Sequence, residues 1–292
     1  MKKLFRFIAG AIGKKRSFRI IDFLLHYNQL SIKDYFQHKF DKKELDGASV
    51  VGHAYRMIGI NEMHGGEKKF IENTLPVLIK TKKPVFFDVG ANIGEITTAL
   101  HAAMPQATIY SFEPNPELLI ELEKNIGSFA NIINKGLSDK ISEANLFMNA
   151  ENDESSLASI YHDVLTDLHL TSELKKVSIQ LDVLDSFCMQ HKIDRIDFLK
   201  IDTEGNELKV LKGAKGMIDN DRIGIIQFEF NEMNIVSRVF LKDFYDLLSA
   251  KYDFYRLTAS DKIALGSYSS LHEIFRYQDM VLIHKNHENF KN

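Results

Sequence analysis

The chain has 292 residues, a formal net charge of −3, 45% hydrophobic residues and 26% charged residues. This size suits one large α/β domain with an appendage, and the composition is that of a packed globular chain. The balanced charge excludes a global basic field, so we expect no nucleic-acid partner. The single cysteine, Cys188, excludes an internal disulfide and a four-cysteine zinc site. A reducing, cytoplasmic location is the simplest expectation.

The N-terminal part of the chain, residues 1–82, is expected to form a helical extension, because its apolar residues recur at helical spacing. Residues 1–19 contain seven Lys and Arg side chains and no acid. A signal peptide is excluded because Arg6 interrupts a short apolar run that leads into further basic residues. Two alternatives remain for residues 1–19: a helix packed on the protein, or a helix lying on the inner membrane surface. No apolar run is long enough to predict a transmembrane helix.

Strands alternate with helices from residue 83 to residue 292, the predicted catalytic domain. The segments expected as strands are 84–89, 107–112, 131–134, 196–201, 223–230, 254–257 and 280–283, and helical spacing follows most of them. This alternation predicts an α/β fold, with a mainly parallel sheet covered by helices on both faces.

An insertion at about residues 140–182 interrupts this alternation. Segments 144–148 and 177–181 have the character of paired strands, and a polar stretch and a short helical segment separate them. An insertion at the carboxyl end of a strand is either a substrate loop or lid, or a solvated excursion. The sequence leaves both alternatives open.

A glycine-containing turn, Asp88-Val-Gly-Ala-Asn-Ile-Gly94, follows the first strand of this domain and opens a helix. Glycines let the backbone approach a ligand closely, and the helix N-terminus attracts a negative group. The spacing G-x-N-x-G differs from the G-x-G-x-x-G of dinucleotide sites. The shorter form suits the carboxylate of an amino-acid-like ligand, whose ammonium group Asp88 is placed to hold. The alternative is an ordinary strand–helix turn.

An acidic residue, Glu113, ends the second strand, 23 residues after Gly90. A carboxylate at this point can accept hydrogen bonds from both hydroxyls of a ribose. Its alternative role is to cap the helix that follows. With the glycine turn, Glu113 predicts an adenosine-containing ligand.

A run of charged residues, from Lys200 to Glu207, lies at the carboxyl end of the strand 196–201. Glu229 ends the next strand and is expected at the same edge of the sheet. Asp202, Glu204 and Glu229 are the catalytic candidates, since a carboxylate can take the proton from an attacking hydroxyl. Asp202 and Glu229 are also candidate ligands of a divalent cation. Glu207 suits the first turn of a helix, where an acid is favourable.

Five segments together resemble the FkbM-type S-adenosylmethionine-dependent methyltransferases. They are FFDVGANIGEITT, SFEPNP, GLSD, LDSF and FLKIDTEGNELKVLKGA, and the resemblance covers about residues 60–235. It implies a class I methyltransferase fold, a Rossmann-like sheet of strand order 3-2-1-4-5-7-6. It also implies methyl transfer to an oxygen, often on a sugar or a natural product.

The resemblance implies a set of cofactor-binding residues. Gly90, Asn92 and Gly94, with Ala91 in the same loop, would line the methionine part of S-adenosylmethionine, Glu113 would hold the ribose, and Ser138 and Asp139 would lie near the adenine. The first 60 residues do not match the family pattern.

Two other functions fit parts of the sequence. An NAD-dependent oxidoreductase shares the fold and the ribose acid, but the glycine spacing counts against it. A non-catalytic scaffold could bind the cofactor and attach to a membrane through its basic N-terminus, but it would have no need of the acids expected in the cleft. The acceptor that the resemblance implies is a small molecule or a glycan.

Overall fold

The computed structural model describes residues 66–150, 158–171, 173–258 and 261–286. All of them belong to one compact unit, Ile58–Asn292. The proposed membrane-surface helix at 1–19 and the rest of the extension before residue 66 lie outside the described residues. Within the described ranges, no helix combines the length and the apolar character needed to cross a membrane.

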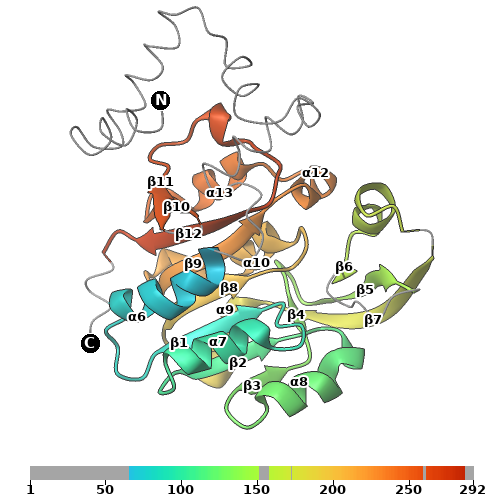
Figure 1. Ribbon diagram of the computed structural model, residues 1–292, viewed down its shortest axis with the longest axis horizontal. Coiled ribbons are helices and arrows are strands. Elements are labelled where there is room, and N and C mark those ends of the chain that lie inside the picture. The colour runs from blue at the N-terminus through green and yellow to red at the C-terminus, as the bar shows by residue number, and fades with distance from the viewer. Residues whose placement is uncertain (1–65, 151–157, 172, 259–260, 287–292) are drawn as a thin grey trace, which may run out of the picture. The chain divides into compact units, whose positions relative to one another are not determined.

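The main sheet has eight strands in the order β11-β10-β12-β9-β8-β1-β2-β3 (Figure 1). The strands are β1 Val85–Val89, β2 Thr108–Phe112, β3 Asn131–Ile133, β8 Ile196–Ile201, β9 Ile223–Phe230, β10 Tyr252–Leu257, β11 Lys262–Ala264 and β12 Gln278–His284. Five adjacent strands are parallel to one another: β3, β2, β1, β8 and β9. Strand β12 runs antiparallel between β9 and β10. The predicted α/β fold with a mainly parallel sheet is confirmed.

Helices cover both faces of this sheet (Figure 1). One face carries α5 Gly66–Lys69, the π-helix η1 Phe70–Thr74, α6 Leu75–Leu78 and α7 Glu95–Ala103. The other carries α9 Leu184–His191, α10 Glu207–Gly213, α11 Lys215–Asp219 and α13 Leu241–Leu248. The remaining helices are η2 Pro116–Leu118, α8 Leu119–Ile126, η3 Val164–Leu168, α12 Met233–Ser237 and η4 Ser270–His272.

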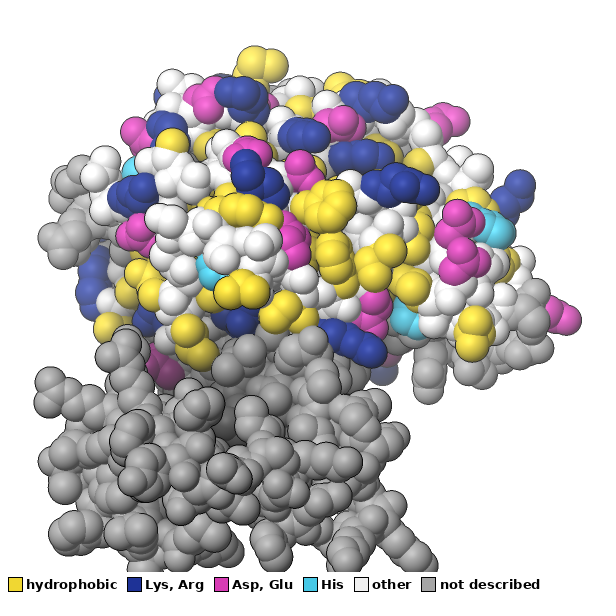
Figure 2. Space-filling view, turned by 90° about the horizontal axis from the view of Figure 1, so that it is seen from above, with side chains coloured by type: hydrophobic (Ala, Val, Ile, Leu, Met, Phe, Trp, Pro, Cys, Tyr) yellow, Lys and Arg dark blue, Asp and Glu magenta, His cyan; other side chains and the backbone are white. Residues whose placement is uncertain are grey.

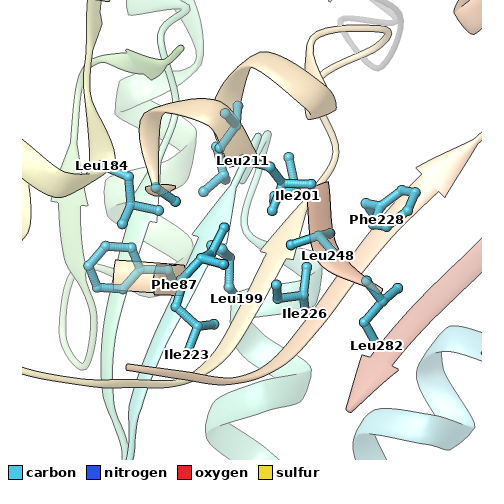
Figure 3. Packing of buried hydrophobic residues seen from close by; sticks show 14 of the residues in the cluster. Phe87, Leu184, Leu199, Ile201, Leu211, Ile223, Ile226, Phe228, Leu248 and Leu282 are labelled. Atoms are coloured by element: carbon cyan, nitrogen blue, oxygen red, sulfur yellow. The ribbon is translucent and has the colours of Figure 1, made fainter. Parts of the chain in front are cut away.

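The central strands are apolar on both faces because helices bury both. In β1, Phe86 packs with α6 and α7, and its neighbour Phe87 packs with α9 on the opposite face. Phe198 and Leu199 divide between the faces in the same way. Figure 3 shows Phe87 and Leu199 together in the cluster of the second face. Successive side chains of a strand point to opposite faces, so a strand buried on both must be almost continuously apolar.

The insertion forms a second sheet of order β4-β7-β5-β6. Its strands are β4 Gly136–Leu137, β5 Ser142–Asn149, β6 Ala158–Ser159 and β7 Leu174–Asp182. Strands β5 and β7 pair antiparallel, as expected for segments 144–148 and 177–181. The expected helical segment between them is the π-helix η3. Four buried side chains, those of Leu146, Met148, Ile179 and Leu181, form the apolar core of this sheet.

The molecular face shown in Figure 2 mixes side chains of all types. Basic side chains are interspersed with acidic and hydrophobic ones over this face. This distribution agrees with the small net charge of the sequence.

The turn after β1 is fixed by close contact with two neighbouring strands. The amides of Gly90 and Ala91 donate to the carbonyl oxygen of Phe112 in β2, at 2.9 and 3.0 Å. Gly90 has a φ of +88°, and a Cβ atom there would lie 1.7 Å from the carbonyl oxygen of Asp202. Only glycine fits between β2 and the end of β8, so this turn requires Gly90 for the backbone packing itself.

Replacing Gly90 by alanine should therefore destabilise the fold more than the same change at Gly266. Gly266 also has a positive φ, of +66°, but nothing lies within 4 Å of its Cβ position. In both variants the left-handed conformation lowers the free energy of unfolding by about 1–2 kcal/mol. At Gly90 the steric clash lowers it by about 1–3 kcal/mol more. Urea denaturation measures both losses, and equal losses would contradict the close contact with Asp202.

Candidate active site

One pocket lies between the carboxyl ends of β1, β2 and β8 and the apolar side of the insertion sheet. Its main-sheet side is formed by Val89, Gly90, Asn92, Glu113, Pro114, Leu118, Asp202, Thr203, Glu204 and Asn206. Its other side is formed by Gly136, Leu137, Leu146, Ala158, Ile160, Ile179 and Leu181. The pocket brings together five predicted site residues: Gly90, Asn92, Glu113, Asp202 and Glu204. Its polar residues therefore lie on the main sheet, opposite an apolar wall.

The glycine turn is divided between the pocket and the interior. Gly90 and Asn92 line the pocket. Ala91 is buried against α8, and a Cβ atom at Gly94 would lie 2.7 Å from Ile126 of that helix. Gly94 is the left-handed N-cap residue of α7. Ala91 and Gly94 thus shape the turn by packing on α8.

Glu113 is buried at the pocket and held by the backbone. Its Oε2 accepts from the amide of Asn92 at 2.9 Å and its Oε1 from the amide of Asn115 at 2.8 Å. Burial raises the pKa of Glu113 to about 7, although these two hydrogen bonds act to lower it. The cap of the following helix is Asn115, whose side chain accepts from the amide of Glu117. Glu113 therefore does not serve as that cap, and each of its oxygens keeps a lone pair for a ligand.

Asp88 lies beneath the turn, outside the pocket lining. Its Oδ2 accepts from the hydroxyl of Thr97 on α7 at 2.7 Å, which ties β1 to that helix. Its Oδ1 is buried and has no hydrogen-bond partner. Burial raises the pKa of Asp88, and the nearby ammonium of Lys200 opposes that rise.

Ser138 and Asp139 also lie outside the pocket lining. The Ser138 amide donates to Asp182 of β7, its hydroxyl donates to Asp139, and the Asp139 side chain is exposed. Their immediate neighbours, Gly136 and Leu137, line the pocket instead. The residues of this segment that line the pocket therefore come just before the two that the resemblance implies.

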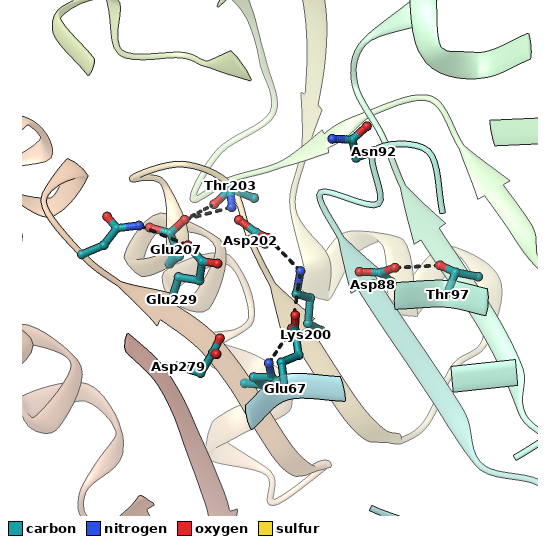
Figure 4. Close-up of polar contacts among 12 residues, drawn as sticks. Glu67, Asp88, Asn92, Thr97, Lys200, Asp202, Thr203, Glu207, Glu229 and Asp279 are labelled. Atoms are coloured by element: carbon teal, nitrogen blue, oxygen red, sulfur yellow. Dashed lines mark hydrogen bonds and ion pairs between the residues drawn. The ribbon is translucent and has the colours of Figure 1, made fainter. Parts of the chain in front are cut away.

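The three catalytic candidates lie close together, and Figure 4 shows two of them, Asp202 and Glu229. Asp202, Glu204 and Glu229 each offer a carboxylate oxygen, and these oxygens lie within 4.8 Å of one another. Beside them, the Lys200 ammonium is 2.8 Å from Oδ2 of Asp202 and 3.8 Å from Oε1 of Glu67. The parallel strands β8 and β9 bring the acids together because their carboxyl ends share one edge of the sheet.

Glu207 holds the loop that presents these acids. Its Oε1 accepts from the amide and hydroxyl of Thr203, at 2.9 Å each, and from the amide of Gly205 at 3.1 Å. This agrees with the expected place of Glu207 in the first turn of a helix, and it fixes the backbone around Glu204. Glu204 itself has a left-handed φ of 55°, and its Oε2 is buried without a hydrogen-bond partner.

Two further acids complete the cluster, and sequence analysis missed both. Asp279 of β12 is paired in register with Glu229, and Glu67 of α5 accepts from Gln227 at 2.6 Å besides its contact with Lys200. An acid in the otherwise apolar segment 279–283 was a usable signal for Asp279. The sequence around Glu67 carried no such signal, because Glu67 stands among other charged residues.

Burial and mutual repulsion raise the pKa values of the clustered acids. Desolvation is the largest cause for Glu229, Glu204 and Asp279, and neighbouring carboxylates raise their pKa values further. Burial alone would lower the pKa of Lys200, but Asp202 and Glu67 hold it well above its ordinary value. The lysine is therefore a fixed positive charge within an acidic cluster.

The sheet and the glycine turn after β1 define a Rossmann-like α/β protein. The sequence model of the family described as the methyltransferase FkbM domain matches residues 88–254, more than half of the chain. The chain belongs to this family and is a methyltransferase.

Individual relatives agree with this assignment. The chain is 20% identical over 164 residues to the 2-O-methyltransferase NoeI of Sinorhizobium fredii (strain NBRC 101917 / NGR234). The aligned region covers 53% of this chain and 68% of that protein. It is 28% identical over 173 residues to the methyltransferase sdnD of Sordaria araneosa, covering 50% and 66%. A solved O-methyltransferase from Bacillus cereus in complex with SAH has 11% identity and a TM-score of 0.43, covering 85% of this chain and 96% of that one. A structural similarity of that size supports no statement about function.

Lys200→Met should destabilise the protein strongly, because it leaves Asp202 and Glu67 without their buried cation. Breaking a buried ion pair from one side costs about 3–5 kcal/mol. The matched control is Lys215→Met, since Lys215 pairs with Asp219 on an exposed helix surface. That exposed pair should contribute only ~0.3–0.5 kcal/mol. Urea denaturation at neutral pH compares the variants, and similar losses would show that Lys200 does not stabilise the cluster.

Proposed function

We propose that this methyltransferase moves a methyl group from S-adenosylmethionine to a hydroxyl oxygen of a sugar in a glycan or glycolipid, or of a natural product. The observation that carries the proposal is the single pocket that joins Gly90 and Glu113 to Asp202 and Glu204. A cofactor held by the first two residues would have its reactive end near the acids. A protein that only binds the cofactor would not need these acids.

The two sides of the pocket suit the two ends of the cofactor. The carboxylate of Glu113 would accept from the ribose hydroxyls, and Gly90 and Asn92 would border the methionine part. The apolar side chains of Leu137, Ile179 and their neighbours would cover the adenine. In this proposal Ala91, Gly94, Ser138 and Asp139 shape the backbone around the cofactor, and Asp88 supports the turn from below.

The reaction is an in-line displacement in which the acceptor oxygen forms a bond to the methyl carbon as the carbon–sulfur bond breaks. Bound S-adenosylmethionine supplies the activated methyl group, and the sulfur keeps the electron pair. The chain has to align the acceptor and draw away its hydroxyl proton. Asp202, Glu204 and Glu229 are proposed for these tasks, because they converge beside the pocket.

The relatives support the chemistry of the proposal. One of them is named a 2-O-methyltransferase, which favours oxygen as the methylated atom. Membership of a methyltransferase family, with the glycine spacing of the turn, favours S-adenosylmethionine over NAD as the cofactor. The cytoplasmic location and the membrane contact of residues 1–19 stay predictions, which cell fractionation and vesicle sedimentation can test.

The affinity for the demethylated cofactor, S-adenosylhomocysteine, should rise with pH through about 7. Glu113 accepts the ribose hydroxyls best as a carboxylate, and its raised pKa of about 7 leaves it half protonated at neutral pH. Binding should therefore tighten between pH 6 and 8 and then level off. Calorimetry over this range measures the effect. Glu113→Gln should bind more weakly and lose this pH dependence, and an unchanged profile in that variant would remove Glu113 from the ribose site.

The direct test of the function is transfer of a labelled methyl group to glycans and lipids extracted from cells. Asp202→Asn keeps the shape of the side chain and removes its charge, so we expect turnover to fall by about 10²–10⁴, the usual contribution of a proton acceptor. Cofactor affinity should change little, because the charge acts on the acceptor. The control is Asp219→Asn, an exposed acid on α11. Normal turnover by Asp202→Asn would assign Asp202 a structural role, and a wild type without methyl transfer to any hydroxyl would overturn the proposal.

A further inference from the structure

The acids at the ends of β8 and β9 have the arrangement of a cation site. Asp202, Glu204 and Glu229 come from two neighbouring parallel strands and the loop after one of them, and their nearest oxygens lie within 4.8 Å of one another. Three ionised carboxylates at this spacing repel one another unless a positive charge lies between them. Carboxylate oxygens are the ligands preferred by Mg²⁺ and Mn²⁺.

A second observation comes from another strand. Asp279 of β12 is only 5% exposed, and its Oδ1 has no hydrogen-bond partner. It stands opposite Glu229 in the β9–β12 register, so both side chains project from the same face of the sheet toward the cluster (Figure 4). A buried carboxylate oxygen without a partner is costly, by about 1–3 kcal/mol or more. Its position beside Glu229 leaves this oxygen open to a positive group at the centre of the cluster.

The charge balance leads to the same conclusion. Six acids surround Lys200, namely Glu67, Asp88, Asp202, Glu204, Glu229 and Asp279. Among the described residues, Lys200 is the only cation that forms an ion pair with any of them. Lys200 can balance only one ionised carboxylate, so a bound divalent cation would favour the ionised forms of the acids whose pKa values burial and mutual repulsion raise.

The three acids are also held in place by partners that leave oxygens available. Lys200 holds Oδ2 of Asp202 at 2.8 Å, and the side-chain amide of Asn231 donates to Oε2 of Glu229 at 3.1 Å. The hydroxyl of Ser159 donates to the main-chain oxygen of Glu204 at 2.8 Å, which fixes the loop but not the carboxylate. Outer partners of this kind orient the ligands of protein metal sites.

We propose that Asp202, Glu204 and Glu229 bind one divalent cation of the Mg²⁺ or Mn²⁺ class, with Asp279 adding negative charge behind Glu229. Because Asp202 and Glu204 also line the pocket, the cation lies at its edge, where water or an acceptor completes its coordination. Its catalytic role rests on the proposed function. It would select acceptors with two neighbouring oxygens, such as a vicinal diol of a sugar, and favour loss of the hydroxyl proton.

The test is titration of the full chain with Mn²⁺ alone, followed by electron paramagnetic resonance of the free ion. One Mn²⁺ per chain is expected, displaced by excess Mg²⁺. Glu229→Gln and Asp202→Asn should each weaken binding at least tenfold, and the control Asp219→Asn should bind as wild type does. Thermal melting establishes whether each variant is folded. If either variant is not folded, the number of Mn²⁺ ions bound per wild-type chain tests the proposal. Lack of binding by wild type, or equal binding by folded variants of the cluster, would overturn the proposal.

Methyl transfer with and without a chelator separates this inference from the proposed function. Mn²⁺ binding without transfer to any acceptor would contradict the function and leave the cation site standing. Transfer at an unchanged rate after chelation, by a chain that binds no Mn²⁺, would overturn the cation site and leave the function standing.

Discussion

The buried ammonium of Lys200 is the charge on which the site depends. It contacts Asp202 at the end of β8 and Glu67 on α5, and it faces Asp88 across the β1–β8 pair. These groups come from three parts of the chain, and each would be a costly buried charge without the lysine. Lys200 thereby lets the sheet place several carboxylates at one edge and still fold.

The pocket takes its two-sided character from the meeting of two sheets. The carboxyl ends of the main sheet supply backbone amides, Glu113 and the acids after β8. The insertion supplies an apolar wall, because strands β5 and β7 turn the buried side of their own small core toward the same space. A ligand with a polar sugar and an apolar base would match both sides, so the insertion works as part of the cofactor pocket in the function proposed above.

The same three acids are proposed both as ligands of the cation and as acceptors of the hydroxyl proton. Asp202, Glu204 and Glu229 would all lose their charge on accepting protons, whereas a bound cation would keep them ionised and oriented. Lys200 already contacts Asp202, and the side-chain amide of Asn231 already donates to Glu229. A cluster of carboxylates with a bound cation would suit an acceptor that is recognised through its oxygen atoms better than an apolar acceptor.

The sequence by itself determined the features that depend on neighbouring residues. The alternation of strands and helices, the left-handed glycine turn and the acid at the end of β2 are all encoded within short segments, so local pattern sufficed to find them. Pairing of the two strands in the insertion was also predicted, from the strand character of segments 144–148 and 177–181. The acidic motif around Asp202 could be placed at a strand end for the same reason.

The sequence placed Glu229 at the same sheet edge as Asp202, but only the tertiary structure showed that Asp279 and Glu67 also belong to the site. Asp279 joins the cluster through the antiparallel register of β12 beside β9, and Glu67 through the packing of α5 on the sheet. The structure also turned Ala91 and Gly94 toward α8, and placed Leu137 in the pocket with Ser138 outside it. Strand order and the direction of a side chain follow from how whole elements pack, and a one-residue shift in register reverses which face a side chain occupies. No short segment of sequence contains that information.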